Sequence, residues 1–326
     1  MKSELNEIRV DSKDLILREN KVTSPILPQT TEQLKRSVII EGDVEVFGPV
    51  YGDKVLVHHG PVSFFKSVFG KEELVVDPSA EGDVIFHNAV GSGQVVSAAA
   101  SKGRTVFASD VNATRVTLRN CFVGGCVYGD EIILDHCVVL GGAFATKSLS
   151  VNHSIVGTFN SQSVSIEGMN YLLYPSAFSV EPVEAASTAE LYNITLADLM
   201  GLFKGEEQKD ATGRIRIDLK GDAQRANLKA DDGSIILVHS YSVAGKVLVA
   251  DMSDFEKLGN HFLINAGALS SQLMKDYEVT DAQGQERKLS LEEIRDFFFK
   301  VLDGEVEIRM MDSDIDFEEM KRKFGH

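Results

Sequence analysis

The sequence predicts a mainly β protein, with a narrow parallel β-helix of about seven to eight turns followed by a smaller α+β domain. Three observations predict this. Short runs of alternating apolar residues recur through the first half of the chain. A corner written VYGD or VFGK precedes such a run three times, at 50–53, 68–71 and 127–130. After Pro182, the last proline, the pattern changes to helical spacing and longer alternating strands.

The first 37 residues are expected to form an N-terminal segment that covers the first turn. The stretch LNEIRVDSKDLILRE at 5–19 is periodic enough for a strand or a short helix. Pro25 and Pro28 then discourage regular structure, because proline lacks an N–H donor.

Between residues 38 and 180 the chain is expected to form the β-helix and its exit linker. The repeated segments share an apolar residue, any residue, an apolar residue, a polar residue and a corner residue. Where the repeat is regular, their starting points lie 15 to 19 residues apart, which is one turn of a narrow coil. The segments are 38–42 (VIIEG), 55–59 (VLVHH), 74–78 (LVVDP), 84–88 (VIFHN), 105–109 (TVFAS), 116–120 (VTLRN), 132–136 (IILDH), 149–153 (LSVNH) and 164–168 (VSIEG).

Strand alternation assigns the residues that face the interior. A single turn cannot bury its apolar side, but a stack of turns encloses one continuous core. The expected columns are Val116, Ile132, Leu149 and Val164; Leu118, Leu134, Val151 and Ile166; Val123, Val139 and Val156; and Tyr128 with Phe144.

Residues 74–115 are less regular and are expected to form two turns of about 21 residues each. VIFHN (84–88) and TVFAS (105–109) would then lie on a second face, separated by longer loops such as GSGQVVSAAASKGR at 91–104. The GSG at 91–93 lacks the further glycines and the helix of a dinucleotide-binding fingerprint, so we interpret it as a loop.

Gly52, Gly70 and Gly129 are predicted to be corner residues of the coil. A coil of short strands must bend sharply between its faces, and glycine accepts the positive φ that such corners often need. No helical crossovers separate the strands, which argues against a βαβ domain.

Asn120, His136 and His153 fall at one corner on three successive turns. They could form a ladder of stacked, hydrogen-bonding side chains, or His136 and His153 could hold a metal ion. The ladder is favoured, because a metal site also needs a third or fourth ligand and supporting residues. We therefore expect no metal and no cofactor.

The three cysteines, Cys121, Cys126 and Cys137, are predicted to be free thiols, because an odd set within one short region does not match a secreted disulfide framework. Cys121 and Cys137 stack one turn apart, with Ser154 next in the column. A structural role as small buried hydrophobes is favoured. The alternative is a redox pair.

The first half of the chain resembles the bactofilins, polymer-forming bacterial cytoskeletal proteins. The resemblance rests on VIIEGDVEVFGPVYGDKVLV at 38–57 and VTLRNCFVGGCVYGDEIILDHCVVLGGAF at 116–144, and it covers about residues 38–168. It implies a right-handed β-helix and self-assembly into filaments. This chain differs from that family in adding about 145 residues with the pattern of a folded domain.

Residues 181–326 are expected to form the α+β domain. A helix is expected over 188–205 and a second over 290–304, where Ser290 and Glu293 fit a capping box. The expected strands between them are 213–221, 225–230, 234–240 and 246–252.

No catalytic residues are predicted. DSDIDFEE at 312–319 resembles an EF-hand start but has Phe317 where Gly is required and Lys323 where Glu is required. His58 and His59 could act as a general base, but the pattern specifies no acidic partner. The turn lengths do not keep the strict six-residue period of hexapeptide-repeat acyltransferases.

Charge argues against nucleic acid as a partner, and hydropathy argues against an integral membrane segment. The net charge of −16 divides into 20 acidic and 15 basic residues in 1–180, and 29 acidic and 18 basic residues in 181–326. Nucleic-acid binding needs a basic face, which is not visible. No apolar run approaches a membrane span, and a cytoplasmic location is expected.

Two functions follow as hypotheses. The first is a non-enzymatic scaffold in which the β-helix rod self-associates, while the acidic C-terminal domain caps or limits assembly or binds a protein partner. The alternative is an enzyme or ligand-binding protein whose site lies between the rod and the C-terminal domain. His239, Tyr241, Asp251 and His261 are the residues proposed to line that site.

Overall fold

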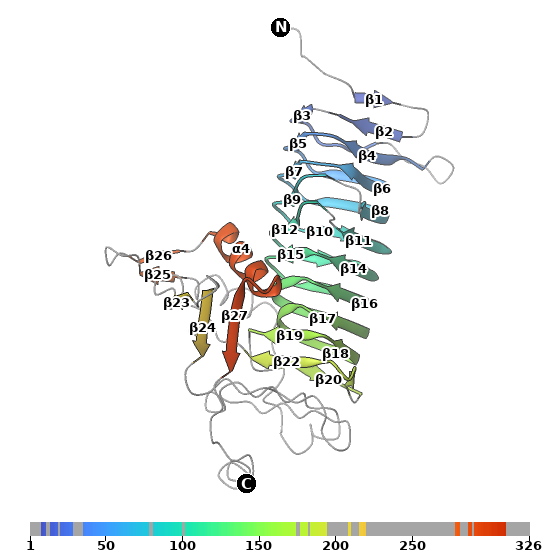
Figure 1. Ribbon diagram of the computed structural model, residues 1–326. Coiled ribbons are helices and arrows are strands. Elements are labelled where there is room, and N and C mark those ends of the chain that lie inside the picture. Colours follow the sequence, from blue (N-terminus) through green and yellow to red (C-terminus); the bar gives the residue numbers. More distant parts are fainter. Residues whose placement is uncertain are drawn as a thin grey trace.

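The computed structural model shows a rod built from a parallel β-helix of about eight turns, and the described residues beside it form helix α4 (Leu291–Leu302) and several short strands (Figure 1). The prediction of a mainly β protein with a parallel β-helix is confirmed. The structure describes residues 8–10, 14–18, 20–28, 35–77, 81–99, 102–173, 177–181, 183–193, 208–209, 215–219, 278–280, 286–288 and 290–310.

Each turn of the rod contributes strands to three faces, here called faces A, B and C, and each strand pairs in parallel with the strand one turn further on. Long strands bend around corners and belong to more than one face. Face A contains β2 (Asp14–Leu17), β4 (Ser37–Glu41), β11 (Val95–Ala99), β14 (Arg115–Arg119), β21 (Glu184–Ala185) and the later parts of β6 (Val50–His59), β8 (Val68–Val76), β16 (Val127–Asp135), β17 (Val138–Asn152) and β18 (Ile155–Glu167).

Faces B and C complete the turn. Face B contains β3 (Asn20–Val22), β5 (Val44–Val46), β7 (Val62–Phe64), β9 (Val84–Phe86), β12 (Thr105–Phe107), β15 (Cys121–Val123), the first parts of β17 and β18, β19 (Met169–Leu172) and β22 (Glu190–Asn193). Face C contains β10 (Val90–Ser92), β13 (Val111–Asn112), β20 (Phe178–Ser179), the first parts of β6, β8 and β16, and the middle of β17 and β18.

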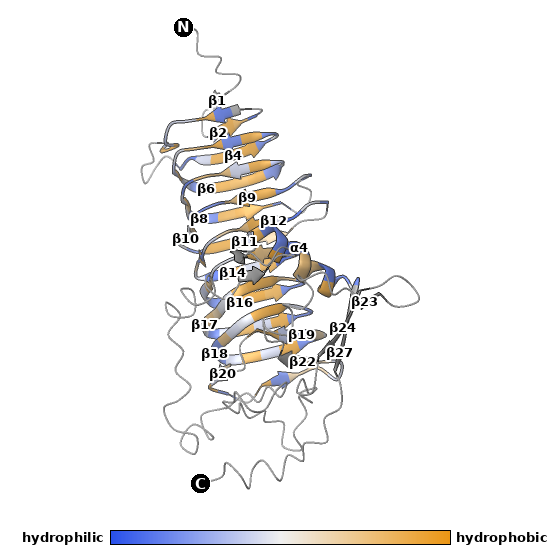
Figure 2. Cartoon of the chain, turned by 90° about the vertical axis from the view of Figure 1, so that its left-hand side faces the viewer, coloured by the Kyte–Doolittle hydropathy of each residue, from blue (hydrophilic) through white to orange (hydrophobic). Residues whose placement is uncertain are grey.

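Apolar columns fill the interior, as Figure 2 shows by the orange residues along the strands. Val116, Ile132, Leu149 and Val164 pair in register and are buried, which confirms the first expected column. The columns of Leu118 and Val123 are likewise confirmed. On face B, three buried phenylalanine rings stack about one strand spacing apart: Phe64, Phe86 and Phe107, with centroids 4.8 and 4.9 Å apart.

Tyr128 and Phe144 share a column, but it lies on the outer side of face C. Their neighbours Val127 and Ala143 are fully buried and take the interior positions. The expectation that the two aromatic residues face inward is therefore wrong. Alternation runs through VYGD, so a buried Val directly before the aromatic residue places the ring outside.

The region 74–115 forms two turns, and VIF and TVF lie on face B as predicted, in β9 and β12. The loop predicted for 91–104 is wrong, because Val90–Ser92 forms β10 and Val95–Ala99 forms β11. Val96 and Ala98 face inward between the turns above and below. Gly, Ser and Ala obscured a strand whose alternation is intact.

The positive-φ corner is not the one occupied by Gly52, Gly70 and Gly129. Those glycines lie where face C turns into face A, and their φ angles are not positive. They are needed for close approach instead: a Cβ on Gly70 would lie 2.2 Å from the Glu73 carbonyl oxygen, and one on Gly129 would lie 2.9 Å from the Ala113 oxygen.

Both ends of the predicted β-helix extend beyond the expected limits. Before residue 38, β2 and β3 form a turn of their own, and β1 (Ile8–Val10) pairs antiparallel with β2. After residue 168, β19 to β22 continue the rod to Asn193, so the expected linker is part of it. Glu190–Asn193 is a strand rather than the start of the helix expected over 188–205, because it pairs with the edge of β19.

The described C-terminal elements are short. β23 (Gln208–Lys209), β24 (Ile215–Leu219) and β27 (Val306–Met310) form one sheet, β25 (Glu278–Thr280) and β26 (Glu286–Lys288) a hairpin, and α4 spans Leu291–Leu302. The strand predicted at 213–221 and the capped helix predicted at 290–304 are confirmed. The strands predicted at 225–230, 234–240 and 246–252 lie outside the described residues.

Candidate functional site

The candidate site is the corner between faces A and B, where α4 meets the rod. Asn120, His136 and His153 occupy this corner on three successive turns with φ angles of 53°, 52° and 43°. Non-glycine residues rarely adopt this left-handed conformation, and Asn and His are among the types enriched in it. The two imidazole rings stack with centroids 5.2 Å apart and planes 16° apart.

Helix α4 brings the other half of the site. Ser290 caps its N-terminus through a complete capping box with Glu293, and Asp303 is its C-cap residue. One side of the helix is buried, including Phe298 and Phe299. Its first turn lies near Gly124 at the end of β15, and its last turn lies at the histidine corner, so the helix crosses face B (Figure 1).

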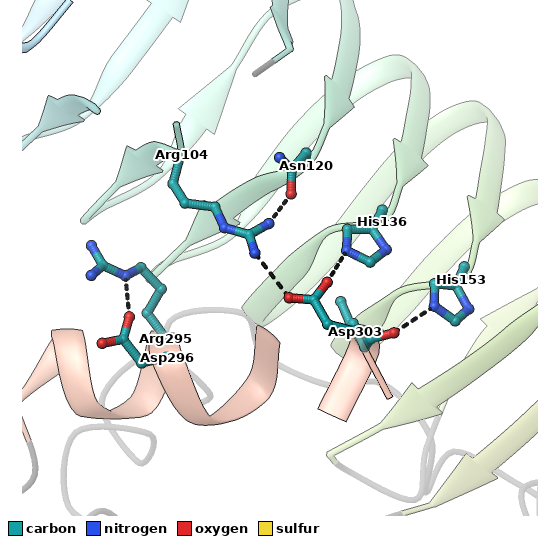
Figure 3. Close-up of polar contacts among 8 residues, drawn as sticks. Arg104, Asn120, His136, His153, Arg295, Asp296 and Asp303 are labelled. Carbon is teal, nitrogen blue, oxygen red and sulfur yellow. Dashed lines mark hydrogen bonds and ion pairs between the residues drawn. The ribbon is translucent and has the colours of Figure 1, made fainter. Parts of the chain in front are cut away.

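Three polar contacts hold the helix end against the corner (Figure 3). The His136 Nε2 lies 2.9 Å from Asp303 Oδ1, and the Arg104 Nη2 lies 3.1 Å from Asp303 Oδ2. The His153 Nε2 lies 2.9 Å from the Leu302 carbonyl oxygen. Because a carbonyl only accepts, His153 carries its proton on Nε2.

Arg104 connects the two halves further. It donates to the Asn120 side chain, and its guanidinium carbon lies 3.7 Å from the centroid of the Phe299 ring. The last carbonyls of a helix carry partial negative charge, so imidazole and guanidinium donors stabilise this end. The corner is therefore built to bind a helix C-terminus.

An open depression of about 500 Å³ lies beside these contacts and is lined by Lys102, Gly103, Arg104, Asn120, His136 and Asp303. The charged groups are engaged with one another: Asp303 binds Arg104 and His136, and Lys102 pairs with Glu81. In the part of the chain that the structure describes, no group of three or more His, Cys, Asp or Glu residues is placed to hold a metal ion. His136 and His153 already use their Nε2 atoms as donors to α4.

Sequence reasoning missed the apolar outer surface of face B beneath α4. In register, the outward residues of this face change from polar at the N-terminal end to apolar further down, and Phe122, Val138 and Ile155 are fully buried. The outward column is Lys21, Glu45, Ser63, Ile85, Val106, Phe122, Val138, Ile155 and Tyr171. The signal was present in the unbroken apolar runs CFV and CVVL, which lack an outward polar residue.

The cysteines are buried free thiols. Burial, together with the neighbouring Cys137, raises the pKa of the Cys121 thiol well above its usual range. Next in this corner column, Ser154 Oγ accepts from the Cys137 N–H at 3.0 Å, and Asn170 Oδ1 accepts from the Ser154 N–H at 2.8 Å. These hydrogen bonds form a buried polar ladder along the column.

The remaining candidates are dispersed. His58 Nδ1 lies 3.4 Å from the Asp77 carboxylate one turn away, on the outer side of face A. The segment 312–319 lies outside the described residues, as do His239, Tyr241, Asp251 and His261. The structure therefore describes none of the residues proposed to line an interdomain cleft.

Comparisons with protein-family models, curated proteins and solved structures found no match to this chain. Among the described residues, no helix is long and apolar enough to cross a membrane.

Proposed function

We propose that the protein is a non-enzymatic scaffold whose β-helix rod associates with a second copy through face A. The observation that carries the proposal is an apolar column on the outer side of this face. Ile16, Ile39, Leu56 and Val75 lie in register on four successive turns and are half-buried. Figure 1 shows α4, β24 and β27 on another side of the rod.

The column of Ile16, Ile39, Leu56 and Val75 is here called the face A stripe. Charged pairs border it on both sides. Lys54 with Glu73 lies along one edge, and Arg18 with Glu41 lies along the other. An apolar centre with a polar rim is the usual anatomy of a protein interface. Both pairs are formed within the rod, so covering the stripe leaves none of these four charges without a partner.

The C-terminal part limits assembly in this proposal by covering face B. Helix α4 removes the apolar surface of Phe122 and Val138 from other chains, which leaves face A for association. A bactofilin-like filament, in which rods also join end to end, is the more specific version of the same proposal. It rests on the resemblance of 38–57 and 116–144.

The test is the oligomeric state of the full chain, measured by size-exclusion chromatography with light scattering and by negative-stain microscopy. We expect dimers or larger particles for the wild type and monomers for Leu56→Lys. Ser150→Lys is the matched control, because Ser150 lies further down the same outward column, beyond the stripe. A wild type that stays monomeric at all concentrations, or a Leu56→Lys variant that assembles like it, would contradict the proposal.

The second candidate is a small-ligand-binding protein with its site in the depression beside α4. The observation that favours it is that Lys102 and Arg104 stand together there with Asp303. An anion would compete with Asp303 for Arg104. Inorganic phosphate that binds more tightly to Asp303→Asn than to the wild type would support this function, and no heat of binding with either protein would exclude it.

A further inference from the structure

A groove runs parallel to the rod axis where face C turns into face A. Its cavity volume is about 540 Å³, and the same three positions line it on successive turns. Small residues form its floor, aromatic and amide side chains one wall, and hydroxyl and carboxylate groups the other. The floor is Ala113, Gly129 and Ala145; the first wall is Asn112, Tyr128, Phe144 and Asn160; and the second wall is Thr114, Asp130 and Thr146.

The aromatic wall leaves ring surface uncovered. The Tyr128 and Phe144 rings are 18° from parallel, with centroids 5.5 Å apart. The centroid distance exceeds the strand spacing of about 4.8 Å, so the rings are offset rather than directly above one another. Both side chains are half-buried, so each ring keeps some surface accessible along the groove.

The opposite wall offers polar groups without net charge. Thr146 Oγ1 donates to Asp130 Oδ1 at 2.6 Å, and Lys147 Nζ lies 2.9 Å from Asp130 Oδ2. The hydrogen bonds from Thr146 and Lys147 lower the pKa of the Asp130 carboxyl, which stays ionised and paired. A neutral ligand therefore fits this wall better than a charged one.

The floor allows close approach to the backbone. Ala113 and Ala145 are buried in the core, and a Cβ on Gly129 would lie 2.9 Å from the Ala113 oxygen and 3.3 Å from the Ile132 side chain, so backbone rather than long side chains forms the floor. A flat ring can therefore lie low between the two walls. Turns repeat about every 4.8 Å, so the groove presents the same groups at regular intervals.

We propose that this groove binds a linear neutral oligosaccharide. Sugar rings combine flat C–H faces, which pack on the exposed parts of Tyr128 and Phe144, with hydroxyl edges, which bond to amide, hydroxyl and carboxylate groups. A polymer of such rings matches a groove that repeats its lining every turn. The site lies on other turns than the face A stripe and does not depend on self-association.

The test is isothermal titration of the full-length protein with linear hexasaccharides of β-1,4-linked glucose and of β-1,4-linked N-acetylglucosamine. We expect at least one to bind with a dissociation constant of roughly 1 mM or tighter. Tyr128→Ala and Asn112→Lys should each weaken binding at least tenfold. Asn112 is exposed, so its variant keeps the test valid if Tyr128→Ala does not fold.

Tyr51→Ala is the matched control. Tyr51 stacks on Phe69 in the same outward column, with centroids 5.6 Å apart, but lies outside the groove. Its variant should bind within twofold of the wild type. The proposal is overturned if neither hexasaccharide binds, if Tyr51→Ala weakens binding as much as Tyr128→Ala, or if a folded Tyr128→Ala or Asn112→Lys variant binds as tightly as the wild type.

Discussion

His136 serves the backbone and the binding of α4 at once. Its left-handed conformation turns the chain from face A to face B, and its imidazole reaches Asp303, which lies 167 residues further along. The same corner holds Gly42 and Gly168 on other turns, both with positive φ. Histidine, rather than glycine, therefore occupies this corner on the turns that contact α4, although its left-handed conformation costs free energy.

Replacing His136 by valine or by asparagine separates these two roles. Both changes remove the imidazole, but asparagine accepts the left-handed conformation and valine does not. We expect the free energy of unfolding of His136→Val to be about 1–2 kcal/mol lower than that of His136→Asn. Urea denaturation followed by circular dichroism measures both values. Equal free energies of unfolding for the two variants would show that the left-handed conformation at residue 136 does not affect stability.

Because Tyr171 is buried, we expect the protein to lose stability at alkaline pH. Tyr171 is 5% exposed on the outer side of face B, and burial raises its pKa from 10.0 to about 12. The unfolded chain loses this proton near pH 10 and the folded protein near pH 12. The contribution of Tyr171 to the free energy of unfolding is therefore fully present below pH 10 and is lost as the pH rises towards 12.

The raised pKa of Tyr171 corresponds to a decrease of roughly 2–3 kcal/mol in the free energy of unfolding between about pH 10 and 12. Urea midpoints measured at intervals between pH 9 and 12 check it. We expect Tyr171→Phe to lose less stability over the same interval, because phenylalanine has no proton to release. Parallel curves for the two proteins would rule out this origin of the pH dependence.

Helix α4 and the outer side of face B depend on each other. The helix buries Ile294, Phe298 and Phe299, and the strands beneath it carry Phe122 and Val138 where polar residues stand further up the rod. Neither surface is suited to water, so the pair is one packing unit. The corner contacts with Asp303 set the position of the helix along the rod.

Val138→Asp places a charge beneath α4 and should release the helix. An unpaired carboxylate cannot be buried there without a large penalty. We expect amide hydrogen exchange over 291–302 to become at least tenfold faster, with the β-helix circular dichroism unchanged. Ser63→Asp, in the same outward column but above the helix, should leave the exchange of α4 unchanged. Slow exchange in both variants would contradict the packing.

At the scale of the whole molecule, the rod is a stack of similar units. Each turn contacts only its neighbours, and the inward columns continue across turns of unequal length because bends and loops absorb the difference. Val55 pairs with Leu74, and Ile40 lies above Val57 as Val57 lies above Val76. One complete turn can therefore be removed without shifting any strand to another face.

Deleting residues 55–73 should give a shorter rod that still folds. Lys54 then precedes Leu74 and takes the place of Glu73, with which it pairs in register. Deleting residues 55–64, about half a turn, moves strands from one face to another and should abolish cooperative unfolding. Circular dichroism and urea denaturation distinguish the two variants. Similar behaviour of both would contradict a rod of interchangeable turns.

The local alternation of the sequence was enough to predict the rod. Period-two patterns such as VTL, IIL and LSV are set within three residues, and their repetition every 15 to 19 residues places them in columns. The prediction failed where glycine, serine and alanine replaced larger residues, as in β10 and β11, although buried and outer residues still alternate there. It also missed the strands after residue 168, whose pairing depends on the edge of the preceding turn.

By itself, the sequence determined the β-helix, its interior columns through Val116, Leu118 and Val123, and the capped helix at 290–304, because each follows from contacts among residues close in the chain or from a regular repeat. The tertiary structure decided which corner is left-handed, which outer face α4 covers and where a groove opens beside Tyr128. Those features depend on how one turn stacks on the next and on contacts across about 150 residues, such as His153 with Leu302. A local sequence pattern cannot predict a contact between residues so far apart in the chain.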